Sequence, residues 1–479
     1  MAGGVMQLVA VGAQDQFISG SPEISYFKMV YKRHTNFSME SVRQTFSTKP
    51  TLDVPRNTFI CRINRVADLL QEVYLSVQIP NIYSSDKFRF RWVENLANYM
   101  IYSCAVRIDT QLIDQSWGEW MDVWNELSLS TDKKTAYDKL TGNVEEFVNP
   151  KRLDPYVIID NNNISYSSYP IGGRTFENPS IKGRRLFIPI PFWFTKNPGL
   201  ALPLIALQYQ NIDITIEFRG IEELYQLFDI ETGLYISPDE YRRKYLNLNI
   251  AKYNEDFISG IENNDVGIQR FLVPLGADYS SLNSYIDMDA YLECNYIFLD
   301  ESERKSMAAQ SHDYLIERVY RIDREGVINQ GTIDLVLQNP VKEIVWITRR
   351  GDAAKYNSWN NFTNSLIKLP NYPILKTAKI LWNGMERFEE KPPEYFNYIQ
   401  PFQYHTRCPR DGIYAYSFAL YPEKPQPSGT FNASTINKIQ MYVTTNPVLG
   451  DYEYEFIFYS VYYNVFRVMS GSGGMVFAN

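Results

Sequence analysis

The sequence is poor in the residue types that build metal sites, disulfide frameworks and many catalytic sites. Among 479 residues it has four cysteines and three histidines. These residues are Cys61, Cys104, Cys294, Cys408, His34, His312 and His405. The cysteines lie far apart without a Cys-x-x-Cys pair, which is typical of reduced thiols and argues against a disulfide framework or a zinc site. The histidines have no candidate ligands nearby, so we predict no metal site, and His34 is interpreted as a surface or interface residue.

Long apolar runs and a basic arm are also missing. No run reaches the roughly 18 apolar residues of a membrane span, and the N-terminus lacks the basic start of a secretory signal. The formal net charge is −8, and basic residues occur in short clusters that are typical of solvated surface. The clusters are Lys182-Gly183-Arg184-Arg185, Arg242-Arg243-Lys244 and Arg349-Arg350. We therefore expect no direct binding of nucleic acid by charge neutralisation.

Recognised catalytic motifs are absent as well. The sequence contains no GxxxxGK phosphate loop, no HExxH and no GxSxG elbow. Glu119 and Glu386 fall at related places in the two halves of the chain and could be imagined as a carboxylate pair. We interpret them instead as turn residues on separate domains, too far apart to cooperate. The sequence therefore predicts no enzyme, with no catalytic, cofactor-binding or metal-binding residue and no cofactor.

What the chain does have is aromatic residues and a two-residue period. It contains 36 Tyr and 27 Phe, and apolar and polar residues alternate in many short runs that predict half-buried strands. The runs include Phe59–Ile63, Val73–Ile79, Val106–Ile108, Leu186–Phe194, Ile212–Phe218, Leu292–Phe298, Ile333–Leu337, Ile344–Trp346, Ile380–Trp382, Tyr414–Leu420, Ile439–Val443, Tyr454–Phe458 and Val461–Val468. Pro189 and Pro191 lack N–H donors, so their run is expected at a sheet edge or bulge.

Few helices are predicted between these strands. Residues 117–127 form the first helical segment, with Trp117, Trp120 and Trp124 on one stripe. Residues 130–180 are interpreted as a long surface loop, 220–285 as an insertion, and 302–318 as a helix-permissive linker between two domains. Residues 106–124 and 378–396 share a faint order of strand, polar turn and aromatic segment, which suggests two copies of one β architecture. This pattern indicates sandwiches or barrels, and two eight-stranded jelly rolls would use the available strands.

The N-terminal segment carries a compact helix signal. Ser21 is a good N-cap, Pro22 suits the first helical position and Glu23 faces the positive end of the helix dipole. Ile24, Phe27 and Tyr31 recur at helical spacing and form one apolar stripe. We therefore predict a docked helix at residues 22–33. Residues before Ser21 have no such periodicity. Their glycines raise the entropy lost on ordering, so we predict an arm that needs contacts from a neighbouring element.

Four blocks in order closely resemble major capsid proteins of nucleocytoplasmic large DNA viruses. They span residues 7–37, 296–317, 414–432 and 463–474. They include Gln7-Leu8-Val9-Ala10, Tyr31-Lys32-Arg33-His34-Thr35-Asn36-Phe37, His312-Asp313-Tyr314-Leu315-Ile316-Glu317, Gln426-Pro427-Ser428-Gly429-Thr430 and Tyr463-Asn464-Val465-Phe466-Arg467. Residues 130–180 and 220–285 carry no such block.

The resemblance implies an all-β double jelly roll, two consecutive eight-stranded jelly rolls with long loop insertions and few short helices. The expected divisions are an assembly arm at 1–25, a first jelly roll at 26–303, a linker helix at 304–318, a second jelly roll at 319–470 and a tail at 471–479. It further implies a homotrimeric, pseudo-hexagonal capsomer that tiles an icosahedral shell. Expected partners are neighbouring capsomers and minor capsid and penton proteins, with an internal membrane nearby but no transmembrane segment. The expected location is the virion capsid, with synthesis and assembly in the host cytoplasm.

One other function stays open on the sequence, because jelly rolls are also common in lectins. We interpret most aromatic residues as core, since they fall on the inward phase of strands, but a sugar site in the outer loops is not ruled out. Four Asn-x-Ser/Thr motifs match the glycosylation pattern. They are Asn163-Ile164-Ser165, Asn361-Phe362-Thr363, Asn432-Ala433-Ser434 and Asn36-Phe37-Ser38. We expect the first three at the surface, Asn36 buried, and all of them mostly unmodified by the secretory route.

Overall fold

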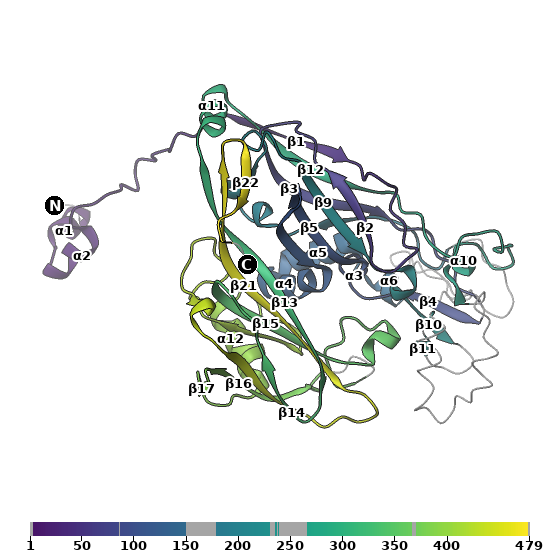
Figure 1. Cartoon of the computed structure of the whole chain (residues 1–479). Coiled ribbons are helices and arrows are strands. Elements are labelled where there is room, and N and C mark those ends of the chain that lie inside the picture. The colour runs from purple at the N-terminus through teal and green to yellow at the C-terminus, as the bar shows by residue number, and fades with distance from the viewer. Residues whose placement is uncertain are drawn as a thin grey trace. The chain divides into compact units, whose positions relative to one another are not determined.

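Residues 38–479 form two β-sandwiches with the same strand order (Figure 1). The structure is a computed structural model that describes residues 3–85, 87–149, 179–229, 235, 236, 238, 266–365 and 370–477. The chain divides into two units, residues 1–37 and residues 38–479. The motif at Asn163, the basic cluster at Arg242 and much of the two expected insertions lie outside the described residues.

The first sandwich consists of two facing sheets. One has the order β1-β12-β3-β7, with β8 paired to β3 off this path, and the other has the order β2-β9-β5-β6. The strands are β1 (Phe37–Gln44), β2 (Asn57–Arg62), β3 (Leu69–Gln78), β5 (Ile101–Ile108), β6 (Gln111–Trp117), β7 (Arg185–Pro189), β8 (Leu202–Pro203), β9 (Ile212–Phe218) and β12 (Ala290–Leu299). Counted along the two main paths, strands 1-8-3-6 face strands 2-7-4-5.

The second sandwich repeats this arrangement. Its sheets have the orders β13-β21-β15-β18 and β14-β20-β16-β17, and β19 and β22 pair with β15 and β21 off the first path. The strands are β13 (His312–Val327), β14 (Gln330–Asp334), β15 (Pro340–Arg350), β16 (Leu375–Trp382), β17 (Met385–Glu386), β18 (Ile413–Ser417), β19 (Phe431–Asn432), β20 (Ile439–Thr445), β21 (Tyr454–Met469) and β22 (Ser472–Met475). The main paths again read 1-8-3-6 and 2-7-4-5.

This duplication confirms the two predicted eight-stranded jelly rolls. The duplication also explains why residues 106–124 and 378–396 share a faint order of strand, polar turn and aromatic segment. The hairpin β5–β6 and the hairpin β16–β17 are strands 4 and 5 of their sandwiches, and each is followed by a helical segment. The two stretches therefore resemble each other because they occupy equivalent places in two copies of one fold.

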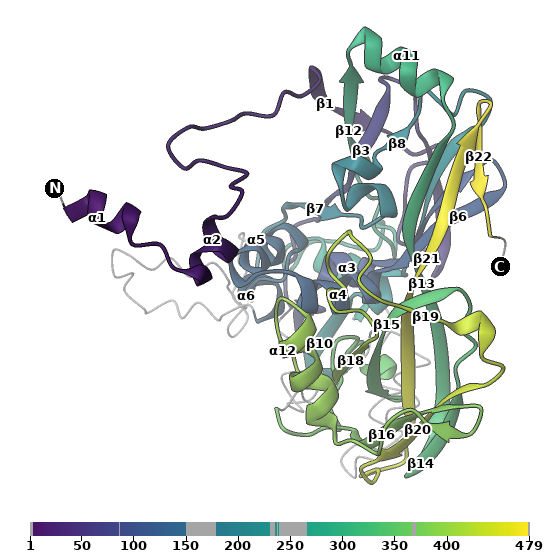
Figure 2. The ribbon, with the colours of Figure 1, turned by 90° about the vertical axis from the view of Figure 1, so that its left-hand side faces the viewer.

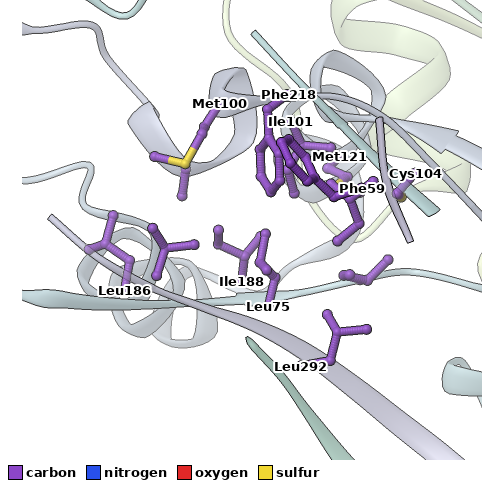
Figure 3. Packing of buried hydrophobic residues seen from close by; sticks show 14 of the residues in the cluster. Phe59, Leu75, Met100, Ile101, Cys104, Met121, Leu186, Ile188, Phe218 and Leu292 are labelled. Carbon is purple, nitrogen blue, oxygen red and sulfur yellow. The ribbon is translucent and has the colours of Figure 1, made fainter. Parts of the chain in front are cut away.

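The core of the first sandwich follows the predicted two-residue period. Leu75 of β3, Ile188 of β7 and Leu292 of β12 point from one sheet towards Phe59 of β2 and Phe218 of β9 on the other (Figure 3). All five side chains are buried. Residues of alternate parity along each strand thus fill the space between the sheets, as expected for half-buried strands.

The run predicted through Phe194 ends earlier as a strand. β7 stops at Pro189, and Trp193–Thr195 forms a short 3-10 helix, η2. β7 is the last strand in its sheet order, which confirms the edge position expected from the prolines. Other short elements are η3 (Pro198–Leu200), η4 (Ile221–Glu223), η6 (Ala353–Tyr356), the π-helix η7 (Tyr395–Ile399), α12 (Gln400–Tyr404) and η8 (Ala433–Thr435).

The helices of the first half are partly as predicted. Residues 117–127 correspond to α4 (Gly118–Ser128), which confirms that helix. The prediction of a loop from residue 130 is wrong for its first part, where the structure has α5 (Thr131–Thr141) and α6 (Glu145–Val148). α5 lacks an apolar stripe, but its Tyr137 is buried and donates a hydrogen bond to Asn98 Oδ1 at 2.7 Å. The hydrogen bond of Tyr137 and the helix-ending Gly142, at φ +77°, therefore define α5, although its sequence has no helical hydrophobic periodicity.

The described part of residues 220–285 agrees with the interpretation as an insertion, because it lies between β9 and β12 and its strands are outside the two four-stranded paths of the sandwich. β10 (Tyr225–Asp229) pairs with β4 (Phe88–Trp92), and β11 (Tyr235–Ile236) completes a three-stranded sheet. The other described helices in this half are α3 (Leu96–Met100) and α10 (Ile268–Phe271). Phe90, Tyr225 and Leu227 of this sheet are buried in the same cluster as the core residues of the first sandwich, which fixes the sheet to that sandwich.

The linker helix is shorter than predicted. α11 spans Glu301–Ala309, and residues 312–318 belong to β13 instead. β13 pairs in antiparallel register with β21 from His312 to Val327. Ladder hydrogen bonds with β21 and burial of Ile316 override the helix-permissive composition of this stretch.

The helix predicted at residues 22–33 is not present. Ser21 has φ +55° and caps no helix, while the helical residues of this unit lie earlier, in α1 (Gly3–Val9), η1 (Ala13–Asp15) and α2 (Gln16–Ser19). The side chain of Phe27 is 100% exposed, and Ile24 and Tyr31 are exposed too. A short helix is marginal unless its apolar face packs on something. Asn36, which was predicted to be buried in the turn after this helix, is exposed, because the helix is not present.

Candidate functional site at the junction of the two sandwiches

A two-stranded ribbon runs through both sandwiches (Figure 2). Figure 2 shows the first sandwich, with β3 and β12, above and the second, with β16 and β20, below, while β13 and β21 pass from one to the other. Ile316 of β13 and Phe466 of β21 belong to the first core, whereas Val327 and Tyr454 of the same strands belong to the second. The same backbone ladder therefore ties the two cores together.

The C-terminal tail adds a second tie. β22 folds back on β21 through a tight turn in which Ser470 and Gly471 have φ values of +53° and +82°. The backbone N–H of Gly473 then donates to Gln210 Oε1 at 2.6 Å, and that of Tyr209 donates to the Gly471 carbonyl at 3.2 Å. The end of the second jelly roll is thus hydrogen-bonded to the first.

Helix α4, which follows the first sandwich's β6, packs on the second sandwich. Its Trp120, Val123 and Leu127 are buried in one cluster with residues of three strands. The strand residues are Val345 and Ile347 of β15, Ile413 and Ala415 of β18, and Ile457, Tyr459 and Val461 of β21. The rings of Trp120 and Trp124 stack at 5.4 Å, and Trp120 lies 5.0 Å from Tyr459. The predicted tryptophan stripe is therefore the apolar centre of the junction.

Glu119 of α4 forms a buried ion-pair network at one end of this apolar centre. Arg349 Nη1 donates to Glu119 Oε1 at 2.9 Å, the Tyr459 hydroxyl donates to Oε2 at 3.1 Å, and Arg321 lies 3.6 Å from Oε2. Arg349 also donates to Glu455 at 2.8 Å. Burial alone would raise the pKa of Glu119, but Arg349 and Arg321 outweigh it and lower that pKa.

These contacts correct two interpretations of the sequence. Glu119 is a buried helical residue and no turn residue, and its partner Arg349 and the neighbouring Arg350 are buried, not solvated. Glu386, by contrast, lies exposed on β17 and accepts from Lys379 at 2.7 Å. Each of the two glutamates is thus neutralised by its own cation.

A second charged cluster connects α4 to the segment after α12. Arg410 pairs with Asp122, and its Nη1 lies 3.3 Å from Glu126. Arg407 Nη2 donates to Glu126 Oε2 at 2.9 Å, and its Nε donates to the Glu126 carbonyl at 3.0 Å. Two acidic residues one turn apart on α4 therefore hold two arginines that lie more than 280 positions later in the sequence.

A third cluster lies at the far end of β15. Lys342 donates to Glu317 Oε1 at 2.5 Å, and Lys196 donates to Oε2 at 3.0 Å. Burial would raise the pKa of Glu317, but the two lysines outweigh it and lower the pKa to about 2. Beside this triad, the buried ring of His405 lies between Glu343 and Glu423.

The junction is built for rigidity. Breaking a buried pair by removing one partner typically costs about 3–5 kcal/mol, because the other charge is left without compensation. Three such clusters surround one apolar centre, and a continuous β ribbon runs alongside it. The two sandwiches are therefore held in one fixed arrangement, and the sequence could not show this because the pairs join positions far apart in the chain.

Features of reactive chemistry are missing from the part of the chain that the structure describes. Within it, no group of three or more His, Cys, Asp or Glu side chains could hold a metal ion. Cys61, Cys104 and Cys294 are buried free thiols, Cys408 is an exposed one, and burial raises the pKa of Cys61 to about 12. No helix among the described residues is long and apolar enough to cross a membrane.

The candidate glycosylation motifs have different surroundings. Asn361 is buried, with its side-chain amide donating to the Ser365 carbonyl at 2.7 Å, so the expectation of a surface site there is wrong. Asn432 is exposed, as predicted, although its side-chain oxygen accepts from the Ser434 N–H at 3.1 Å.

The duplicated strand order and the shared junction define the class of this protein, a double jelly roll. Comparison of the sequence with models of known protein families identifies the family. The family model described as major capsid protein N-terminus matches residues 25–300, and the one described as large eukaryotic DNA virus major capsid protein matches residues 303–474. The chain therefore belongs to the major capsid proteins of large eukaryotic DNA viruses, which are structural proteins and not enzymes.

Individual relatives agree with this assignment. The chain is 31% identical to the major capsid protein of Phaeocystis pouchetii virus and 32% identical to that of Pyramimonas orientalis virus, over 100% of each chain in both cases. Among solved structures, a quasi-atomic model of the PBCV-1 virus capsid matches with a TM-score of 0.67 at 23% identity, covering 95% of this chain and 100% of that one. The Faustovirus major capsid protein matches with a TM-score of 0.64 at 13% identity, over 95% and 94% of the two chains. These structures share the double jelly roll fold.

Proposed function

We propose that three copies of this major capsid protein form a pseudo-hexagonal capsomer. The observation that supports this most is the duplication itself, because one chain presents two copies of one sandwich in a fixed arrangement. Three chains around a threefold axis would present six similar sandwiches, and a near-hexagonal tile covers a surface without gaps. A loose connection between the sandwiches would not define such a tile, whereas the buried junction does.

In this proposal the capsomers tile an icosahedral shell in the virion. Neighbouring capsomers, minor capsid proteins and penton proteins are the partners, an internal membrane lies nearby, and assembly takes place in the host cytoplasm. Within the chain, residues 37–299 act as the first jelly roll, residues 312–470 act as the second, and α11 connects them. The segment 471–479 is the tail that folds back through β22.

The trimer is tested by the solution mass of the purified chain. Multi-angle light scattering should give three times the 55.8 kDa mass of one chain at micromolar concentration. Subunit interfaces of permanent assemblies bury over roughly 2,000 Å² in total, so the trimer should not dissociate on dilution into this range. A stable monomer at micromolar concentration would contradict the proposal.

We assign the N-terminal arm, residues 1–25, to contacts between capsomers or with the layer beneath the shell. Residues 1–37 form a compact unit of their own, and Phe17 and Ile18 of the arm expose most of their side chains. Apolar groups exposed in this way favour burial against a partner. The neighbouring Lys28, Lys32 and Arg33 give the stretch a basic character that contrasts with the net charge of −8 for the whole chain.

Deleting residues 2–19 separates this role from folding. The melting temperature and the trimer mass should stay nearly unchanged, whereas the yield of closed shells seen by electron microscopy should fall. A matched variant, Phe17→Ser with Ile18→Ser, keeps the length of the arm and removes apolar surface, and it should lower shell yield as well. If the truncated chain fails to trimerise or melts well below the full-length protein, the arm is part of the folded core.

A further inference from the structure

His405 is buried between two carboxylates from different parts of the second jelly roll. Its side chain is 1% exposed, and that of Glu343 on β15 is 0% exposed. His405 Nδ1 lies 3.1 Å from Glu423 Oε1, and Nε2 lies 3.4 Å from Glu343 Oε2. Both ring nitrogens therefore face carboxylate oxygens.

The carboxylates on the two sides of the imidazole ring differ in the hydrogen-bond donors that they have. Glu423 also accepts hydrogen bonds from the backbone N–H of Thr406, at 3.0 Å, and from its hydroxyl. Burial would raise the pKa of Glu423, but these donors and His405 lower it, so Glu423 is an ionised acceptor and His405 Nδ1 carries a proton. In a neutral imidazole, Nε2 would then present a lone pair to the oxygen of Glu343.

Two lone pairs facing each other at this distance repel, and nothing else relieves Glu343. Neither of its oxygens has a hydrogen-bond partner among the described residues, and His405 Nε2 has none either, so their 3.4 Å approach is a close contact of two buried polar groups. Lys342 is adjacent in sequence, but its ammonium group donates to Glu317 and to the Pro422 carbonyl. A fully buried carboxylate without a donor is costly unless it is neutralised.

We propose that His405 and Glu343 share one proton that the folded protein keeps at neutral and mildly alkaline pH. The charge around the pair supports this. Lys196 and Lys342 bring two positive charges, Glu317, Glu343 and Glu423 bring three negative ones, and the carboxyl group of Asp114 also interacts with Lys196. With a neutral ring the carboxylates outnumber the ammonium groups, and the shared proton reduces this excess of negative charge. Burial also raises the pKa of Glu343, which acts in the same direction.

This proton site belongs to the junction of the two sandwiches. The edge of the Trp124 ring, from α4 of the first half, lies against the His405 ring with centroids 6.2 Å apart. Lys196, directly after η2, and Glu317 of β13 are two charged groups from other elements that face the site. Loss of the proton would leave two carboxylates around a neutral ring and would loosen α12 and the Glu423 loop from β15.

The sign of the pH dependence follows from the proton count. Histidine in an unfolded chain releases its proton near pH ~6.5 and glutamate is ionised above about pH 4.3. Above pH ~6.5 the folded protein would bind one proton more than the unfolded chain. Stability should then be full below that value and should fall as pH rises, with the unfolding equilibrium constant increasing up to about tenfold per pH unit. The loss should stop once the folded pair itself releases the proton.

A direct test detects the proton in the unaltered protein. With three histidines in the chain, labelling at Cε1 gives three imidazole signals in the nuclear magnetic resonance spectrum, assigned with His34→Gln and His312→Gln. At pH 7.5 we expect either an imidazolium signal from His405 or an infrared band of a protonated carboxyl group that disappears in Glu343→Gln. Either result supports the shared proton. A neutral His405 signal together with no such band would overturn it.

The stability test uses a matched pair of variants. Between pH 6.5 and 8.5 the denaturation midpoint of the wild-type chain should fall, and His405→Gln should flatten this slope. His312→Gln is the control, because His312 Nε2 lies 2.7 Å from a backbone carbonyl, that of Met307, and faces no buried carboxylate pair. It should keep the wild-type slope. A wild-type slope no steeper than that of His405→Gln would overturn the proposal, and if His405→Gln does not fold, the spectroscopic test decides alone.

Discussion

The clearest test of the junction is to remove the charge of Glu119 while keeping its shape. In Glu119→Gln the Tyr459 hydroxyl keeps an acceptor, but Arg349 and Arg321 lose a carboxylate at 2.9 and 3.6 Å. Both arginines keep a second carboxylate, since Arg349 contacts Glu455 and Arg321 contacts Asp323. Removing the sole partner of a buried charge typically lowers the free energy of unfolding by about 3–5 kcal/mol. Because both arginines keep a partner, we expect a smaller loss of about 2–3 kcal/mol for Glu119→Gln.

The matched control lies at the equivalent hairpin of the other sandwich. Glu386 pairs with Lys379 on the surface, with side chains 51% and 21% exposed. Exposed pairs typically contribute about 0–1 kcal/mol, so Glu386→Gln should change little. For a chain of this size, about 2–3 kcal/mol corresponds to a melting temperature lowered by roughly 2–3 °C, whereas the control should stay within about 1 °C.

The assay is thermal unfolding of both variants and the wild type at one scan rate, at pH 7 and again at acid pH. The pKa of Glu119 is lowered in the folded protein, so its contribution is present above the ordinary glutamate value and is lost as pH falls. The difference between wild type and Glu119→Gln should therefore shrink under acid conditions. Equal shifts for the two variants at pH 7 would refute the reasoning that the buried cluster holds the sandwiches together.

Three further predictions concern other parts of the molecule. Trp120→Ala should lower stability by about 3–5 kcal/mol, because it empties the apolar centre of the junction, and denaturant unfolding should show a lower midpoint. Stability contributed by Glu317, whose pKa is lowered to about 2, should be complete above its unfolded value near ~4.3 and should be lost as pH falls towards 2; in Glu317→Gln melting curves this acid-sensitive part should be missing. Intact mass should equal the 55.8 kDa of the chain, and any added sugar should map to exposed Asn432 and not to buried Asn361.

The strands could be predicted because their signal is local. Alternation along β9 and β20 reflects one buried face per strand, and that pattern is present in consecutive residues. The prolines of the β7 run likewise predicted an edge from their missing donors. Even the faint similarity of residues 106–124 and 378–396 indicated the duplication, because equivalent hairpins impose similar sequences.

The helices and the junction could not be predicted in the same way. α5 has no apolar stripe and is held by a tertiary contact of Tyr137, whereas residues 22–33 carry a cap signal and an apolar stripe but form no helix. Arg349 looked like solvated surface because its partner Glu119 lies 230 positions away. Charge pairs between residues far apart in the chain produce no periodic pattern in the sequence. Composition alone therefore assigned Arg349 to the solvated surface.

The central claim is that each chain contributes two sandwiches, rigidly joined, to a threefold capsomer. Electron cryomicroscopy of the purified full-length protein tests it most directly. The account predicts a particle with threefold symmetry and six sandwiches, in which α4 lies against β15 in every subunit and the two sandwiches of a chain show no variation in relative orientation. Single chains, or particles whose two sandwiches adopt several relative orientations, would contradict the account.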